Sequence, residues 1–126
     1  MPTRTFSSTF VNWIADAHSI MLHGGGAQID FTTFVDAKFG TAGTRKIPSG
    51  TVCGLNVSGR AIPWTTGVAL LLRSDAYEDS PTAAISGYGF VTGGNVYEAV
   101  LPDAAGTPKV LTAPQKAALG VRFYFQ

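Results

Sequence analysis

"KIPSGTVCGLNVSGRAIPW" (residues 46–64) places a turn, a short strand, a second turn and a proline within one stretch. In the first turn, Pro48 presets φ and Gly50 takes the left-handed conformation, so the chain reverses direction there. Residues 51–55 then form a short strand. Pro63 restricts the next segment to a sheet edge, because proline has no N–H to donate. The stretch has one thiol, no carboxylate and no histidine. It therefore predicts part of a small β-fold without reactive side chains.

The composition of the 126-residue chain predicts one folded domain that belongs to an assembly. Hydrophobic residues make up 45% of the chain and charged residues only 13%, whereas a soluble domain has about 25% charged residues. Disordered chains are polar and highly charged, so disorder is not expected. The 15 glycines and 7 prolines favour short strands and turns. Low surface charge indicates that part of the surface contacts other proteins.

Charge and apolar patterning exclude several kinds of partner. With 9 basic and 8 acidic residues, the chain lacks the basic stripe of nucleic-acid-binding proteins. The longest apolar run, residues 68–72, is too short to cross a bilayer. The first nineteen residues lack the apolar centre of a secretory signal. We therefore expect no nucleic-acid partner, no membrane partner and synthesis in the cytoplasm.

Outward from the opening stretch, alternating or apolar segments predict further strands. They cover residues 18–22, 27–35, 67–74, 83–94 and 121–126. Residues 67–74 are the most hydrophobic and are expected to form a buried central strand. The glycines of residues 83–94 indicate a bend or a close backbone approach. Residues 75–82 are acidic and contain a proline, which predicts an exposed loop.

The clearest helix signal lies near the C-terminus. Thr112 with Gln115 fits a capping box, Pro114 lies in the first turn, and Gly120 is suited to the C-cap. A single helical turn capped by Asn95 is expected earlier in the chain. With six or seven short strands and two or three very short helices, the prediction is an all-β or β-dominated α+β fold. Its architecture is expected to be a small sandwich or open barrel, formed as a single domain by residues 17–126.

Residues 1–16 are predicted to form an N-terminal arm that displays Phe6, Phe10, Trp13 and Ile14. Their spacing fits one face of a helix, and an extended strand-like arm is the alternative. Two destinations stay open for the arm, its own domain or a neighbouring subunit. If it crosses to a partner, deletion of residues 1–16 leaves a folded domain that no longer attaches.

A search for catalytic and metal-binding patterns is negative. His18 and His23, the only histidines, lie near one turn without a serine or cysteine nucleophile signature. The glycine run at residues 24–26 precedes a strand and lacks the helix that a phosphate loop needs. Acidic residues do not have the spacing of a calcium loop. Cys53, the one cysteine, is expected as a small buried apolar residue. We therefore predict no enzyme activity, no cofactor and no bound metal.

Four segments in order resemble a known family. They are "IPSGTVCGL" (47–55), "GVALLLRSDAYED" (67–79), "GYGFVTGG" (87–94) and "VLTAPQKAALGVRFYF" (110–125). This order is similar to that of the small capsid decoration, or cement, proteins of tailed phages, in particular the lambda-like head decoration group. The resemblance covers roughly residues 45–125. Cys53-Gly54 and the longer insert at residues 58–67 depart from the family pattern.

The resemblance implies a structural virion protein that binds the outer surface of the phage head. It would bridge neighbouring major capsid proteins, commonly as a homotrimer. The residues assigned as capsid contacts are Phe6, Phe10, Trp13 and Ile14 in the arm, with Arg45, Lys46 and Arg60 docking on acidic rims. Phe123 and Phe125 are assigned to the core or to the trimer seam, with the core preferred.

Two alternatives remain at this point. The first is another virion module, such as a tail, spike or fibre-tip domain, that binds a host surface through residues 57–66 and 75–82. The second is a small enzyme or a carbohydrate-binding domain unrelated to virions. Its sugar-stacking aromatic residues would be Trp13, Trp64, Tyr77 and Tyr88.

Overall fold

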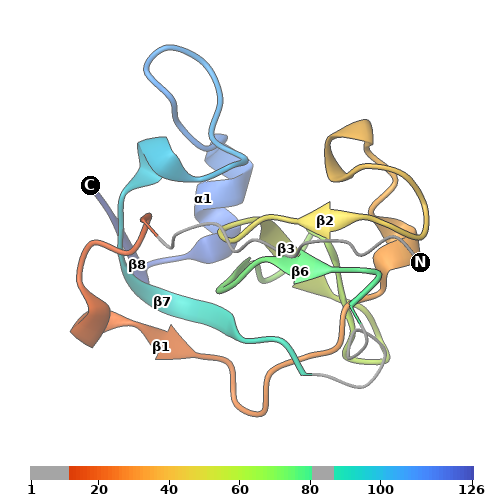
Figure 1. The fold of residues 1–126 in the computed structure, drawn as a ribbon. Coiled ribbons are helices and arrows are strands. Elements are labelled where there is room, and N and C mark those ends of the chain that lie inside the picture. The colour runs from red at the N-terminus through yellow and green to blue at the C-terminus, as the bar shows by residue number, and fades with distance from the viewer. Residues whose placement is uncertain (1–11, 81–86) are drawn as a thin grey trace.

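The computed structural model describes residues 12–80 and 87–126 and is dominated by strands (Figure 1). The strands are β1 (Met21–Leu22), β2 (Lys46–Ile47), β3 (Val52–Leu55), β4 (Ala61–Pro63), β5 (Leu70–Leu72), β6 (Ala76–Tyr77), β7 (Phe90–Val96) and β8 (Phe123–Phe125). The helices are α1 (Ala113–Leu119) and the 3-10 turns η1 (Ala17–Ser19), η2 (Phe31–Thr33), η3 (Ala37–Phe39) and η4 (Glu98–Val100). The predicted β-rich fold class is confirmed, and its main sheet is open.

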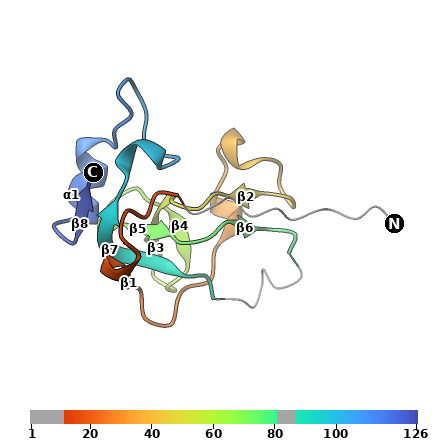
Figure 2. The ribbon, with the colours of Figure 1, turned by 60° about the vertical axis from the view of Figure 1, so that its left-hand side comes forward.

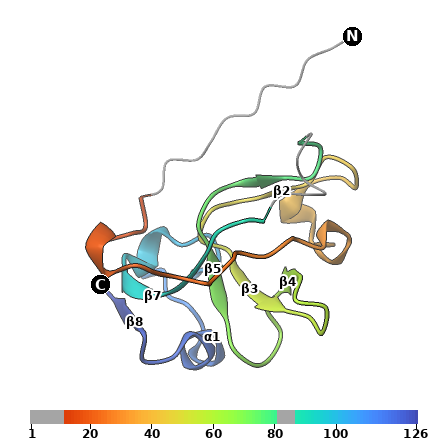
Figure 3. The same ribbon diagram turned by 90° about the horizontal axis from the view of Figure 1, so that it is seen from below.

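The main sheet has the strand order β1-β7-β5-β3-β4, with antiparallel pairing throughout this path. β8 adds to it in parallel, pairing with the last three residues of β7 from Gly94 to Val96. β2 and β6 form a separate antiparallel ribbon. Figures 2 and 3 show this ribbon on one side of the main sheet, with α1 on the other.

β5 is the central strand, as its apolar sequence predicts. Leu71 and Leu72 are completely buried, and Leu70 is nearly so. Successive side chains of a strand point to opposite faces. Leu70 and Leu72 accordingly join one core cluster, with Phe34, Phe90 and others, while Leu71 joins a second cluster. A strand covered on both faces needs a continuous apolar sequence, which is what residues 68–72 supply.

The strand predicted at residues 27–35 is wrong. Ala27 and Ile29 make only isolated bridges, and the chain then turns into η2. Phe31 and Phe34 are both buried in the first cluster although they are three residues apart. That spacing places both rings on one side of a helical turn, whereas a strand would send them to opposite faces. The buried aromatic pair therefore outweighs the local alternation of polar and apolar residues.

The loop predicted at residues 75–82 is only partly a loop, because it begins with β6. The Asp75 carboxylate accepts a hydrogen bond from the backbone N–H of Ser49 at 2.7 Å and pairs with Lys46 at 3.5 Å. Ala76 is fully buried. The acidic residue that suggested an exposed loop is thus the anchor that joins β6 to the Pro48–Gly50 turn.

The predicted C-terminal helix is confirmed as α1. The Thr112 side chain accepts from the Gln115 N–H while the Gln115 side chain accepts from the Thr112 N–H, which completes the capping box. Gly120 follows at the C-cap with φ of 79°. The earlier helical turn forms as η4, but Tyr97 occupies its N-cap in place of the predicted Asn95.

Candidate binding surface

Trp13 belongs to the core, and its assignment as a capsid contact is wrong. Its side chain is 1% exposed. The indole N–H donates to the Ser49 hydroxyl at 2.8 Å, and the Trp13 carbonyl accepts from the Tyr97 N–H at 2.7 Å. The folded body therefore includes residues 13–16, which the sequence assigned to the arm. A large aromatic side chain with its polar atom satisfied inside the domain is not available to a partner. Phe6 and Phe10 lie outside the described residues.

Two of the three cations assigned to docking are held by the protein's own carboxylates. Arg45 pairs with Glu78 at 3.1 Å, and both side chains are largely buried. Lys46 pairs with Asp75 at 3.5 Å. Arg60 differs, because it is exposed on the turn between β3 and β4 and no ion pair to it occurs among the described residues. Of the three, Arg60 alone presents a charge that is not already balanced.

Phe123 is buried in the second core cluster, and Phe125 packs against this cluster with its ring stacked 6.2 Å from that of Phe123. The preferred assignment of these rings to the core agrees with this placement. A part in a trimer seam stays a prediction.

The edge strand β1 exposes two large apolar side chains. Met21 is 47% exposed and Leu22 is 52% exposed. Native proteins usually protect edge strands with charges or a covering segment, so an apolar edge marks a place of contact. On its inner side, β1 pairs with β7, where Met21 lies opposite Gly93.

A pair of glycines in β7 allows this arrangement. A Cβ atom on Gly93 would collide with the Met21 methyl group and lie 2.9 Å from the Arg122 carbonyl oxygen. A Cβ atom on Gly94, whose φ is +140°, would lie 2.6 Å from the Ile20 side chain. A close backbone approach therefore occurs at these two residues, at the end of the predicted strand 83–94. It brings segments near both ends of the described chain against β7.

A first hollow of about 320 Å³ lies where the main sheet is left uncovered. Leu55 of β3, Leu70 of β5 and Thr92 of β7 line it, together with Val68. By strand alternation these positions share a face with Cys53, Leu72 and Phe90 of the first core cluster. The core face of the sheet thus continues into an open apolar surface, and His23 and Arg122 stand at its margin.

A second, smaller hollow of about 160 Å³ lies on the other side of β1. It is lined by Ile14, Ala17, Ile20 and Leu22, with Arg73 as its charged member. Ile14 is partly exposed here, so its assignment as a contact residue stays a prediction. Leu22 lines this hollow and the next residue, His23, lines the first. The edge strand therefore lies between an apolar depression and a smaller one of mixed polarity.

We call the two hollows and the strand between them the β1 surface. It is defined by Met21, Leu22, Leu55, Val68, Arg73 and Arg122.

The β1 surface carries positive charge that the protein itself does not balance. All eight acidic side chains have a partner within the chain: seven accept a hydrogen bond or ion pair, namely Asp16, Asp30, Asp36, Asp75, Glu78, Glu98 and Asp103, and Asp79 is not free either. Within the described part of the chain, Arg73 and Arg122 form no ion pair, although Arg122 donates to the Leu119 carbonyl at 3.3 Å. A complementary partner surface is therefore apolar with carboxylates at its rim.

Among the described residues, this surface holds neither a group of metal ligands nor an exposed thiol. In the ranges 12–80 and 87–126, no three His, Cys, Asp or Glu side chains are grouped as metal ligands. Cys53 is completely buried, and burial, with a smaller effect of the Asp103 charge, raises the pKa of its thiol. A thiol with a raised pKa is a poor nucleophile, since the thiolate is the reactive form.

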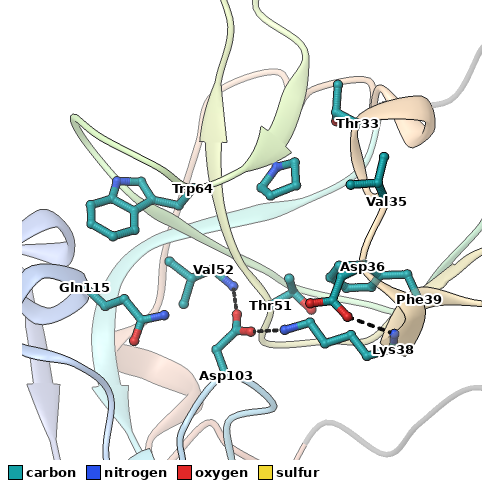
Figure 4. A pocket seen from close by; sticks show the side chains of 11 residues that line it. Thr33, Val35, Asp36, Lys38, Phe39, Thr51, Val52, Trp64, Asp103 and Gln115 are labelled. Atoms are coloured by element: carbon teal, nitrogen blue, oxygen red, sulfur yellow. Dashed lines mark hydrogen bonds and ion pairs between the residues drawn. The ribbon is translucent and has the colours of Figure 1, made fainter.

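A third hollow, of about 330 Å³, lies apart from β1, between the η2–η3 segment, the β3–β4 hairpin and α1. Figure 4 shows Asp103 at the lower edge of this hollow, with Trp64 and Gln115 on one side and Val35, Asp36 and Phe39 on the other. One Asp103 oxygen accepts from the Val52 N–H and the other from the Lys38 ammonium, each at 2.7 Å. These bonds hold the η3 turn against β3.

Comparisons with known proteins identify no relative of this chain. No family model matches it, and searches of curated proteins and of solved structures found no match. None of the described helices has the length and apolar character to cross a membrane. The resemblance to decoration proteins therefore stays a prediction from the sequence.

Of the strand predicted at residues 18–22, only Met21–Leu22 forms β1, because η1 occupies Ala17–Ser19, and the sequence did not predict the β1 surface. Arg73 and Arg122 stand in apolar segments, and their lack of an ionic partner depends on how the acidic residues pair. The sequence feature that relates to this surface is the pair Gly93-Gly94, where residues 20–21 and Arg122 pack closely against β7.

Proposed function

We propose that this protein is a structural subunit of a tailed-phage virion, a decoration protein that binds the outer surface of the head. Its partner is the major capsid protein, and each copy bridges neighbouring capsid subunits. The observation that supports the proposal is the β1 surface, an apolar edge and two hollows with unbalanced arginines. Such a surface fits a binding protein, and the sequence resemblance specifies the kind of partner.

The mechanism of this proposed function is mechanical stabilisation. Burial of apolar area contributes about 25 cal/mol per Å², and the exposed side chains of β1, Leu55 and Val68 provide such area. Arg73 and Arg122 fix the register by pairing with carboxylates of the capsid. Phe6 and Phe10 of the N-terminal segment are assigned to a second attachment on an adjacent capsid subunit. Two attachments on different subunits resist their separation.

The proposal includes self-association into a homotrimer at the capsid. Light scattering of the purified protein, with and without capsids present, tests this part separately. A trimer in solution supports it directly. A monomer in solution that also binds capsids in numbers other than multiples of three contradicts it.

The function itself is tested by sedimentation with empty, expanded capsids of its phage. The decoration hypothesis predicts that the protein pellets with capsids at saturating stoichiometry and does not pellet with host cells. The alternative virion module, a tail, spike or fibre-tip domain, predicts the opposite distribution. Binding to neither contradicts both hypotheses.

A further inference from the structure

We propose that the hollow beside Trp64 is a binding site for a neutral saccharide. The site lies apart from the β1 surface and does not depend on the proposed attachment to a capsid. Its volume of about 330 Å³ falls within the range of small-ligand pockets, which begins at about 300 Å³. Four separate parts of the chain form it, so its geometry is fixed by the fold and not by one loop.

The first element of recognition is an aromatic ring with a fixed position. Trp64 is partly exposed and lines the hollow. Its N–H donates to the Gly67 carbonyl at 2.9 Å, which fixes the orientation of the indole. The ring therefore offers carbon surface, with its single polar atom already satisfied. A sugar ring has one face of C–H groups that can lie on such a surface, whereas its hydroxyl groups point outward.

The second element is a set of polar groups with unused hydrogen-bonding capacity. One Asp36 oxygen accepts from the Lys38 backbone N–H at 3.1 Å, and the other oxygen remains an acceptor. The Lys38 ammonium has three N–H donors, of which one goes to Asp103. Gln115 uses its oxygen in the capping box, which leaves its amide N–H groups as donors. Donors and acceptors thus line the same hollow. The neighbouring hydroxyl groups of a sugar need both, because each hydroxyl can donate and accept a hydrogen bond.

The third element is the balance of charge, which favours an uncharged ligand. Asp36 and Asp103 contribute two negative charges and Lys38 one positive charge. An anion would face both carboxylates, and its attraction to Lys38 is already weakened by the 2.7 Å pair with Asp103. A cation would be attracted by Asp36, but it offers no acceptor to the N–H donors of Lys38 and Gln115, which would lose their water partners without replacement. A neutral molecule with many hydroxyl groups avoids both costs and still uses every polar group.

The experiment is an NMR titration of the ¹⁵N-labelled full chain with glucose, galactose, mannose, N-acetylglucosamine and their short β-linked oligomers. The two indole N–H signals serve as internal probes, because Trp13 is buried and bonded to Ser49 while Trp64 lines the site. We expect at least one saccharide to shift the Trp64 indole and the Lys38 and Gln115 amides saturably. The Trp13 indole signal is expected to stay in place.

Asp16 provides a matched control for Asp36. Each carboxylate caps a three-residue 3-10 turn by accepting the backbone N–H two positions later. Asp36→Ala is expected to weaken saccharide binding about tenfold, the effect of losing one hydrogen bond to a charged group. Asp16→Ala loses an equivalent cap elsewhere and is expected to leave the dissociation constant unchanged. Trp64→Leu, with its fold checked by the Trp13 indole signal, is expected to abolish binding.

Three results would overturn the proposal. The first is that no saccharide shifts the Trp64 indole. The second is equal weakening by Asp36→Ala and Asp16→Ala. The third is tighter binding at the same amides by Nα-acetyl-lysine amide, which would make the hollow a peptide site. Asp36→Ala is expected to attach to capsids normally, so failure here and failure of the proposed function are distinguishable.

Discussion

The indole N–H of Trp13 donates to the Ser49 hydroxyl at 2.8 Å, across 36 positions of the chain. The Ser49 hydroxyl in turn donates to the Arg73 carbonyl at 2.6 Å. These bonds tie the segment before η1 to the Pro48–Gly50 turn and to the end of β5. The N-terminal boundary of the folded body therefore lies at or before Trp13.

The first prediction concerns the stability that Trp13 provides. Trp13→Ala is expected to lower the free energy of unfolding by about 3–5 kcal/mol, because it leaves a cavity and removes the N–H that donates to the buried Ser49 hydroxyl. Tyr124→Ala is the control, since this aromatic side chain is mostly exposed, and it should cost less than about 1 kcal/mol. Urea denaturation measures both. Deletion of residues 1–16 should destabilise the fold for the same reason, contrary to the expectation from sequence.

The second prediction concerns the glycine pair of β7. Gly93→Ala and Gly94→Ala are each expected to lower the free energy of unfolding by about 1–3 kcal/mol, since the added methyl groups meet Met21, Arg122 and Ile20. Gly24→Ala is the matched control, because no atom lies within 4 Å of its Cβ position. Thermal denaturation compares the three variants. Equal effects at all three positions would contradict the packing described around β7.

The third prediction concerns Cys53 at alkaline pH. Burial, and then the charge of Asp103, raise the pKa of its thiol. The unfolded chain releases this proton above about pH 8.5 while the folded chain keeps it. The thiol's contribution to stability is therefore complete below pH 8.5 and falls above it, by on the order of 1.4 kcal/mol per pH unit. Cys53→Ala is expected to show a shallower loss of stability between pH 8.5 and 10. Parallel pH profiles of the two proteins would contradict this account.

The fourth prediction concerns the capping box of α1. Thr112→Ala removes the acceptor for the Gln115 N–H and is expected to lower the free energy of unfolding by about 1 kcal/mol. Thr112→Ser keeps an acceptor oxygen and should stay within about 0.5 kcal/mol of the original protein. Chemical denaturation resolves this difference. A Ser variant as unstable as the Ala variant would mean that the methyl group, not the hydroxyl, matters at this position.

Local signals predicted those parts of the fold that depend on neighbouring residues. The capping box at Thr112, the turn at Gly50 and the buried strand at Leu70–Leu72 all follow from spacing and backbone preference. The strand predicted from Ala27 to Val35 was wrong because Phe31 and Phe34 both pack in the core. The alternating sequence pattern does not show that these two rings must point to the same side. The loop predicted in place of β6 was wrong for a similar reason, because Asp75 is hydrogen-bonded to Ser49 in a turn far away in sequence.

The candidate site was less predictable than the fold. Trp13 was predicted to be an exposed contact because the sequence does not show which residues an aromatic side chain near the N-terminus packs against. In the structure, Trp13 is hydrogen-bonded to Ser49 and Tyr97. Arg45 and Lys46 looked available until Glu78 and Asp75 were placed beside them. Which cations remain unbalanced depends on the pairing of every carboxylate, and that pairing exists only in three dimensions.

The central claim is that the β1 surface is the face that binds another macromolecule. Val68→Glu introduces a charge into its first hollow, at a side chain that is 64% exposed. Val110→Glu makes the same change at a 44% exposed valine in the loop that Figure 1 shows on the side away from β1. Both variants should keep the fold, because neither valine is buried.

Sedimentation of the two variants with empty capsids is therefore the most direct measurement. The account predicts that Val110→Glu pellets with capsids as the original protein does, while Val68→Glu remains in the supernatant. Attachment of both variants, with unchanged affinity, would contradict the assignment of the β1 surface.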